Sequence, residues 1–255
     1  MKIRQTTEKD GNCLFLQWYP EDEYTCFIST GNSIFNNAII KYYGDMSRPA
    51  PIDDGELRIW VKPEVGMKYV IGVDSADPDK DNPVKGDHQV AVVLNHRLQH
   101  VATLRCKVDT NVFASKVSRL GHMYNDAYLV VERNNMGHAT ILALEQIERY
   151  PFMFKTGNKV GWIATQGSKI HLIGTMRESL GALGLTTYDA LLVQELRTFR
   201  KTEKGFGAKP GNHDDLVMAL GMAMVGYNTP EFIALATQGT INNVSRSYGW
   251  AAAGE

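Results

Sequence analysis

Acidic residues adjoin three apolar segments of the chain. Asp74 ends the run YVIGVD at 69–74, Glu132 follows the run YLVV at 128–131, and the pair Asp214 and Asp215 precedes an apolar segment. A carboxylate at the end of an apolar strand costs free energy unless a cation or hydrogen bonds compensate it. We therefore expect a cation to lie on Asp74.

Convergence of these acids would form a metal site. Ligands gather at the carboxyl ends of strands in open α/β sheets, so adjacent strands would place Asp74 and Glu132 side by side. Each acid also has a simpler explanation, since the helix dipole favours Asp214 and Asp215 in a first turn and Glu132 could be a surface residue. Three converging carboxylates repel one another unless divalent cations neutralise them, and oxygen ligands select Mg²⁺ or Mn²⁺. Two such ions about 4 Å apart can activate water and stabilise the leaving oxygen in phosphodiester cleavage.

Charge is unevenly distributed along a chain whose formal net charge is −1. The segment 74–87 carries a net charge of −3, and the segment 197–209 carries +4. The acids of the first are Asp74, Asp77, Asp79, Asp81 and Asp87, and the cations of the second are Arg197, Arg200, Lys201, Lys204 and Lys209. Clustered cations bind phosphates. We predict a metal site beside a flexible basic loop that contacts DNA, with two solvated loops as the alternative.

The composition is that of a soluble globular protein with one main domain, because 44% of its 255 residues are hydrophobic and 22% are charged. Its longest apolar run, 216–225, is far shorter than the roughly 18 residues that span a bilayer. Cys13, Cys26 and Cys106 form no Cys-x-x-Cys pair, so we expect neither a disulfide framework nor a thiolate zinc site. A reducing cytoplasm fits, and no membrane partner is expected.

The elements that must position the carboxylates begin near residue 67. Three apolar runs predict an antiparallel meander with the acidic segment in its first connection; they span 68–74, 88–95 and 98–108. A further strand ends at Glu132, and the runs 152–156 and 160–165 also resemble strands. Helices are expected at 111–124, 138–150, 168–184, 189–199 and 212–227, the first and last capped by Asn111 and Asn212.

This order of elements predicts an α/β fold with a mixed sheet flanked by helices. We expect the domain to span 61–230. Residues 1–60 are interpreted as a separate segment or linker, and 231–255 as a tail.

Five segments occur together in this order: YVIGVDSA at 69–76, GDHQVAVVL at 86–94, YLVVERNNMG at 128–137, ELRTF at 195–199 and GNHDDLVMALGMA at 211–223. The set resembles the C-terminal nuclease domain of the large terminase subunit of tailed bacteriophages. The resemblance covers 57–227. It implies a ribonuclease H-like fold, with a three-stranded antiparallel meander plus parallel strands, and metal-dependent endonucleolytic cutting of concatemeric viral DNA.

The resemblance also implies roles for individual residues. Asp74, Glu132 and Asp214 match the catalytic, metal-binding acids, while Asp215 and Asp87 match acids that can approach a metal; the spacing leaves open whether Asp214 or Asp215 is the nearer ligand. Two ions, Mg²⁺ or Mn²⁺, are implied. The implied partners are double-stranded DNA, the terminase ATPase domain, the small terminase subunit and the portal, in the host cell cytoplasm.

Departures from the family pattern and other residues leave alternatives. No G-x-x-x-x-G-K-[ST] loop occurs, so we expect an excised nuclease module or a split-gene product and attribute no translocation to it. Lys169 could reach a scissile phosphate or be an exposed lysine at a helix start, and His213 could assist a metal or phosphate or cap a helix. The rival functions are a junction resolvase or ribonuclease H, an actin-like ATPase or sugar kinase, and a catalytically silent DNA-docking domain.

Overall fold

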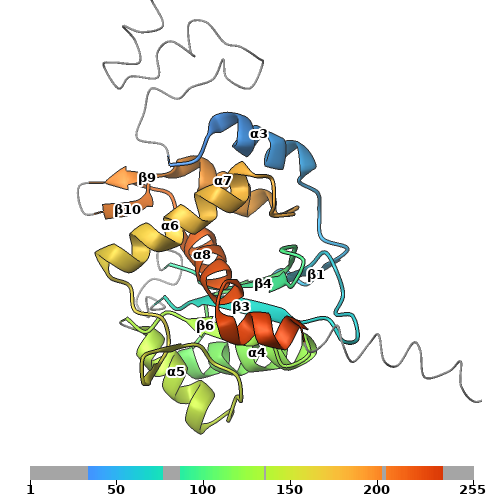
Figure 1. Cartoon of the computed structure of the whole chain (residues 1–255), viewed down its shortest axis with the longest axis vertical. Coiled ribbons are helices and arrows are strands. Elements are labelled where there is room, and N and C mark those ends of the chain that lie inside the picture. The colour runs from blue at the N-terminus through green and yellow to red at the C-terminus, as the bar shows by residue number, and fades with distance from the viewer. Residues whose placement is uncertain (1–33, 77–86, 135, 203–204, 238–255) are drawn as a thin grey trace, which may run out of the picture.

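The structure is a computed structural model that describes residues 34–76, 87–134, 136–202 and 205–237 (Figure 1). Seven charged residues of the two predicted loops lie outside this part of the chain: Asp77, Asp79, Lys80, Asp81, Lys85, Glu203 and Lys204. So do the strand-like aromatic residues before position 34.

A six-stranded mixed sheet forms the centre of the domain, in the order β1-β2-β5-β4-β3-β6. Its strands are β1 (Ile52–Asp53), β2 (Leu57–Ile59), β3 (Tyr69–Asp74), β4 (Gln89–Asn95), β5 (His100–Cys106) and β6 (Tyr128–Val131). The strands β3, β4 and β5 pair antiparallel, which confirms the predicted meander. The strand β6 runs parallel to β3, so the carboxyl ends of these two strands meet at one edge of the sheet.

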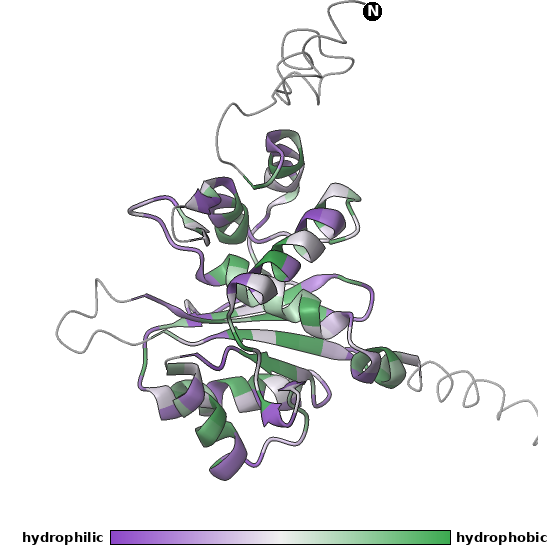
Figure 2. Ribbon diagram, turned by 60° about the vertical axis from the view of Figure 1, so that its left-hand side comes forward, coloured by the Kyte–Doolittle hydropathy of each residue, from purple (hydrophilic) through white to green (hydrophobic). Residues whose placement is uncertain are grey.

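Helices cover both faces of the sheet, giving three layers (Figures 1 and 2). On one face lie α4 (Thr110–Met123) and α5 (Met136–Gln146); on the other lie α3 (Asn37–Met46), α6 (Gln166–Gly181), α7 (Ala190–Thr198) and α8 (Asp215–Tyr227). The predicted apolar face of α4, which includes Phe113 and Val117, is fully buried. Each face has its own apolar core, because the buried strands of the sheet present side chains to both sides.

Helix α8 lies directly on β3 because of Gly72. A Cβ atom added to Gly72 would lie 1.9 Å from the carbonyl oxygen of Ala219 and 2.4 Å from the backbone nitrogen of Ala223. Only a residue without a side chain allows this approach. The close packing brings the amino end of α8 near the carboxyl end of β3, where Asp74 lies.

Residues 34–60, which we expected to belong to a separate segment or linker, pack against the same core. Ile40 and Tyr43 of α3 are buried, and the Tyr43 hydroxyl donates a 3.0 Å hydrogen bond to the carbonyl oxygen of Leu185. Strand β2 pairs with β5. The described part of this segment is therefore tied to the domain by both core packing and sheet pairing.

The structure corrects two predicted helix caps. Asp109 caps α4, since its side chain accepts a hydrogen bond of 2.9 Å from the backbone N–H of Asn111. Asp214 is the N-cap residue of α8, two residues after Asn212, and its side chain makes no capping hydrogen bond. Asn111 lies in the first turn of α4, and the Asn212 side chain turns back to the carbonyl oxygen of Lys209.

The segment predicted as a flexible basic loop is instead a β-hairpin. Strand β9 (Phe199–Thr202) pairs antiparallel with β10 (Gly205–Ala208). Phe199 is fully buried and packs the start of the hairpin against the core. The charged residues around it made this apolar contact hard to predict from the sequence. The runs 152–156 and 160–165 form the short hairpin of β7 (Lys155–Thr156) and β8 (Lys159–Val160), which turns at Gly157 with a φ of +60°. Parallel bridges from Met153 to Leu129 and from Trp162 to Glu132 also join these runs to the edge of β6.

Candidate metal centre

Asp74 and Glu132 lie side by side at the carboxyl ends of β3 and β6. The two strands are in parallel register, with Val73 opposite Val131, and the Glu132 N–H donates a 3.0 Å hydrogen bond to the carbonyl oxygen of Val73. Their side chains also share a hydrogen bond. The sheet pairing therefore brings together two residues that are 58 positions apart in the sequence.

Asp214 reaches the same place from the amino end of α8. Its carboxylate accepts a hydrogen bond from the Ala208 N–H of β10, and one of its oxygens lies close to Gly207, 3.3 Å from where a Cβ would stand. The side chain makes no capping bond to its own helix, so its oxygens are available to the hairpin and to Asp74 and Glu132. We call Asp74, Glu132 and Asp214 the acid cluster.

Burial raises the pKa of all three carboxyls of the acid cluster, and neighbouring negative charges add to this rise. For Asp74, burial contributes most, followed by the negative charges of Glu132 and of the pair Asp214 and Asp215. Burial also raises the pKa of Glu132 and of Asp214, and the positive charge of Lys169 on α6 opposes this rise at both residues. Ionised carboxylates are thus disfavoured here unless a positive charge compensates them, and a divalent cation could supply that charge.

Asp215 faces a second group of residues. Its Oδ2 atom accepts a 3.3 Å hydrogen bond from the backbone N–H of His88 and lies 3.8 Å from Nδ1 of His213. Nδ1 of His213 also lies 3.3 Å from Oδ1 of Asp87. Burial and the charge of Asp87 raise the pKa of Asp215 to about 6. The structure therefore separates the acids predicted from the sequence into two neighbouring groups, with Asp215 between them.

Glu195 holds the amino end of α8 in place. From α7 it accepts hydrogen bonds from the N–H groups of Leu216, at 2.8 Å, and Val217, at 3.4 Å. The first-turn N–H groups of a helix have no partner within the helix, so a buried carboxyl from elsewhere satisfies them. No role was expected for Glu195 or His88 from the sequence. Both residues lie in segments of the terminase resemblance, and this was the sequence feature that could have singled them out.

We expect Glu195→Gln to be tolerated and to remove a pH dependence. Burial raises the pKa of Glu195 from 4.5 to about 8. The folded state thus retains a proton that the unfolded state lacks, and its stability falls as the pH rises from about 5 to about 8, by at most about 1.4 kcal/mol per pH unit. Melting temperatures in chelator across this range should fall less steeply for Glu195→Gln than for the wild type.

The matched control is Glu195→Ala, which removes the acceptor as well as the titrating group. It leaves buried N–H groups of α8 unpaired, which should cost about 1–3 kcal/mol at every pH. Parallel melting curves for the wild type and Glu195→Gln across the pH range would show that Glu195 does not titrate there.

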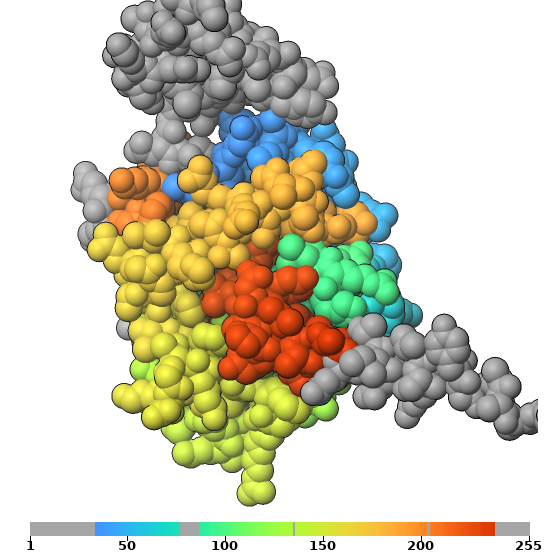
Figure 3. Space-filling model, in the orientation of Figure 1, coloured from blue at the N-terminus to red at the C-terminus, as the bar shows by residue number. Residues whose placement is uncertain are grey.

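The predicted DNA-binding cations lie on and around the β9–β10 hairpin. Arg197 is exposed at the end of α7, Arg200 and Lys201 lie on β9, and Lys209 is exposed just after β10. Figure 3 shows the hairpin (orange) at the edge of the molecule, next to the surface of α6 (yellow), the helix that carries Lys169. Since the backbone of β10 contacts Asp214, the hairpin that carries Arg200 and Lys201 adjoins the acid cluster.

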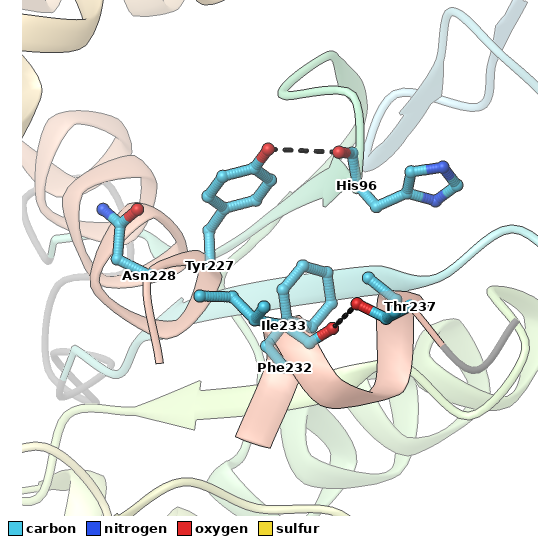
Figure 4. Close-up of a pocket in the computed structure, with 7 residues that line it drawn as sticks. His96, Tyr227, Asn228, Phe232, Ile233 and Thr237 are labelled. Carbon is cyan, nitrogen blue, oxygen red and sulfur yellow. Dashed lines mark hydrogen bonds between the residues drawn. The ribbon is translucent and has the colours of Figure 1, made fainter. Parts of the chain in front are cut away.

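Hollows are also present elsewhere on the molecule. One, of about 390 Å³, lies at the carboxyl end of α8 and is lined by Tyr227, Phe232 and Ile233 (Figure 4). There the Tyr227 hydroxyl donates a 3.1 Å hydrogen bond to the backbone carbonyl oxygen of His96. Among the described residues, no carboxylate lines this hollow. The acidic residues expected to bind a metal lie at the opposite end of α8.

Solved structures with the same arrangement of elements are nuclease domains. The large terminase nuclease from thermophilic phage G20c with bound magnesium is 21% identical, with a TM-score of 0.62 over 77% of this chain and 98% of that chain. The large terminase nuclease domain of Thermus phage P74-26 is 22% identical, with a TM-score of 0.58 over 78% and 97%. This chain has the fold of a large terminase nuclease domain.

The match confirms the predicted fold and its resemblance to this family, with the ribonuclease H-like sheet of large terminase nucleases. The G20c nuclease has also been solved with bound cobalt and with bound zinc, at TM-scores of 0.61 and 0.56. No family model and no curated protein matches the chain. Among the described helices, none is long and apolar enough to cross a membrane.

Proposed function

We propose that this chain is a divalent-metal-dependent endonuclease that cuts double-stranded DNA as part of a viral packaging terminase. The observation that carries the proposal is the meeting of Asp74, Glu132 and Asp214, which come from three separate elements; burial raises the pKa of each, and the charges of Glu132 and Asp214 raise that of Asp74 further. Fully exposed acids on the surface would not show this shift. The terminase nuclease fold supports the same activity.

The donor set fits Mg²⁺ or Mn²⁺. The acid cluster offers only oxygen atoms, and the buried hydroxyl of the adjacent Ser75 has no hydrogen-bond partner among the described residues. Hard divalent ions prefer such ligands. Two bound ions would supply an activated water and stabilise the leaving oxygen of the phosphodiester.

The residues of the chain would act around that centre. Asp74, which interacts with both Glu132 and Asp214, would be the shared ligand, and each of the other two would complete one coordination sphere. Asp215 or Asp87 would adjust the coordination of the second ion. Lys169, whose charge acts on both Glu132 and Asp214, would hold the scissile phosphate beside the acids.

The basic surface would position DNA without reading its sequence. Phosphates would be contacted by five cations: Arg197, Arg200, Lys201, Lys209 and Lys204, which follows β9 in the sequence. Contacts to phosphates carry no information about the bases. We further propose that the domain works in the host cytoplasm with a terminase ATPase domain, a small terminase subunit and a portal, as the family resemblance implies.

The direct test is incubation of supercoiled plasmid with the purified chain and Mn²⁺ or Mg²⁺. We expect nicked and linear products with little sequence preference, and none when a chelator is present. An intact plasmid with either ion, from a folded preparation, would contradict the proposal and favour a silent DNA-docking domain.

Neutralising the hairpin should weaken DNA binding for all sequences. We expect the triple variant Arg200→Gln, Lys201→Gln, Lys209→Gln to flatten the salt dependence of affinity, because each lost phosphate contact reduces the slope of log K against log salt by about 0.9. The measurement is a salt titration of binding to random duplex, in Ca²⁺ to prevent cutting. Exposed cations on other elements, Lys41, Arg119 and Arg149, give the control triple variant. An unchanged slope would place the DNA surface elsewhere.

A further inference from the structure

Two histidines and an aspartate meet beside the acid cluster. His88 lies just before β4, while His213 and Asp215 lie at the amino end of α8. One ligand atom from each of the three residues lies within 4.8 Å of the other two. The two imidazole rings are perpendicular, with their centroids 5.7 Å apart. We call these three residues the histidine cluster.

The backbone already fixes part of this geometry. The His88 N–H donates to Oδ2 of Asp215, which holds that oxygen near the position from which the His88 ring projects. Nδ1 of His213 is 3.8 Å from the same oxygen and 3.3 Å from Oδ1 of Asp87. Asp87 therefore stands beside the histidine cluster as a possible fourth ligand.

Two features of the histidine cluster point to a ligand. The buried Nδ1 atom of His88 has no hydrogen-bond partner among the described residues, although a buried polar atom without a partner is unfavourable. The cluster also supplies two nitrogen donors, in contrast to the oxygen donors of the acid cluster. Imidazole nitrogen suits zinc, cobalt and nickel, whereas Mg²⁺ and Mn²⁺ favour oxygen.

We propose that His88, His213 and Asp215 form a binding site for a transition-metal ion of the zinc class, which lies beside the Mg²⁺ or Mn²⁺ centre and shares Asp215 with it. Zinc is bound at about 2.0–2.2 Å by nitrogen and carboxylate oxygen, so neighbouring ligand atoms of a tetrahedral site lie roughly 3.3 Å apart. The side chains of His213 and Asp87 are 41% and 68% exposed and can rotate to close the remaining gap. Asp215, at 8% exposure, is the fixed ligand.

The site would share Asp215 with the nuclease centre. The charge of Asp215 acts on Asp74, so an ion held by the histidine cluster would compensate that charge and weaken its effect on Asp74. Zinc occupancy would therefore alter the nuclease centre without entering it. This coupling rests on the proposed function, whereas the zinc site itself does not.

The test measures zinc binding rather than cutting. The full chain carrying Asp74→Asn and Glu132→Gln, which weakens the acid cluster as a metal site, is titrated with Zn²⁺ by calorimetry in excess Mg²⁺. We expect one Zn²⁺ per chain. Adding His88→Ala or His213→Ala should lower the affinity about tenfold or more, since loss of an outer-shell partner alone costs 10–100-fold. His171→Ala, on an exposed position of α6, is the matched control.

A spectroscopic measurement distinguishes the donors. Co²⁺ in place of Zn²⁺ should give the visible absorption of a nitrogen- and oxygen-ligated ion, and His213→Ala should remove it. Because the His213 side chain is partly exposed, its variant remains informative if His88→Ala fails to fold. Equal Zn²⁺ affinity with and without His213, or no Zn²⁺ binding while both histidines are present, would overturn the site. Plasmid cutting by the wild type in Mn²⁺ is scored separately, so failure of the nuclease function would not be mistaken for failure of the zinc site.

Discussion

The variant Asp74→Asn is expected to lose metal-dependent plasmid cutting, by about 10³-fold or more, while keeping its fold. Asparagine preserves the shape of the side chain and removes the charge that the proposed ions share. A loss of several kcal/mol of transition-state stabilisation corresponds to this factor, since each 1.36 kcal/mol is tenfold in rate. The measurement is the initial rate of plasmid nicking in Mn²⁺.

The same variant, although inactive, should be more stable than the wild type when no metal is present. Burial and neighbouring acids raise the pKa of Asp74, so the wild type must either hold a proton or bury a repelled charge near pH 8, whereas asparagine does neither. We expect a higher melting temperature for Asp74→Asn in chelator. Mn²⁺ should then stabilise the wild type by about 2.7 kcal/mol at roughly one hundred times Kd, and the variant by much less.

Asp45→Asn is the matched control, because Asp45 is exposed on α3 and distant in sequence from the acid cluster. It should behave like the wild type in all three measurements. Wild-type cutting by Asp74→Asn, or equal Mn²⁺-induced shifts in the two proteins, would remove Asp74 from the proposed metal centre.

The sheet could be predicted from the sequence because its strands have a plain signal. The runs that became β3, β4 and β5 are short, apolar and bounded by polar turns, and local pattern alone assigns them. Asp74 and Glu132 stand directly at the ends of such runs. Parallel pairing of β3 with β6 then brings the two side chains together, so this part of the candidate site followed from the strand assignment.

The hairpin and the support of α8 could not be predicted in the same way. In β9 the cations Arg200 and Lys201 mask the one residue, Phe199, that fixes the strand to the core. Glu195 lies on a helix whose charge pattern resembles any solvent-facing surface, and only the tertiary structure places it beneath α8. Such long-range hydrogen bonds leave no periodic trace in a single sequence.

Similar reasoning applies to the histidine cluster. His88 precedes a strand and His213 precedes a helix, and the sequence separates them by 125 positions. Neither forms a recognisable metal-binding spacing. The packing of α8 across β3 and β4 creates their proximity, and this packing depends on a residue without a side chain.

Gly72→Ala is therefore expected to damage both the fold and the site. The added methyl group would lie 1.9 Å from a backbone oxygen of α8. The three nearest atoms all belong to the backbone of α8, so no flexible side chain can move to make room. Overpacking of a core costs about 1–3 kcal/mol, and a backbone clash belongs at or above the upper end of this range. Displacing α8 also moves Asp214 away from Asp74, so the Mn²⁺-induced rise in melting temperature should shrink as well.

Gly174→Ala is the matched control, since it makes the same chemical change in α6 where an added Cβ meets no atom within 4 Å. Alanine is favoured over glycine inside a helix by about 0.5–1 kcal/mol, so this variant should be slightly more stable than the wild type. The comparison uses denaturant unfolding of both variants, with Mn²⁺-induced melting shifts measured on the same preparations. If Gly72→Ala unfolds at the denaturant concentration of Gly174→Ala and keeps the full Mn²⁺ shift, the close contact of α8 with β3 is not what holds the acids together.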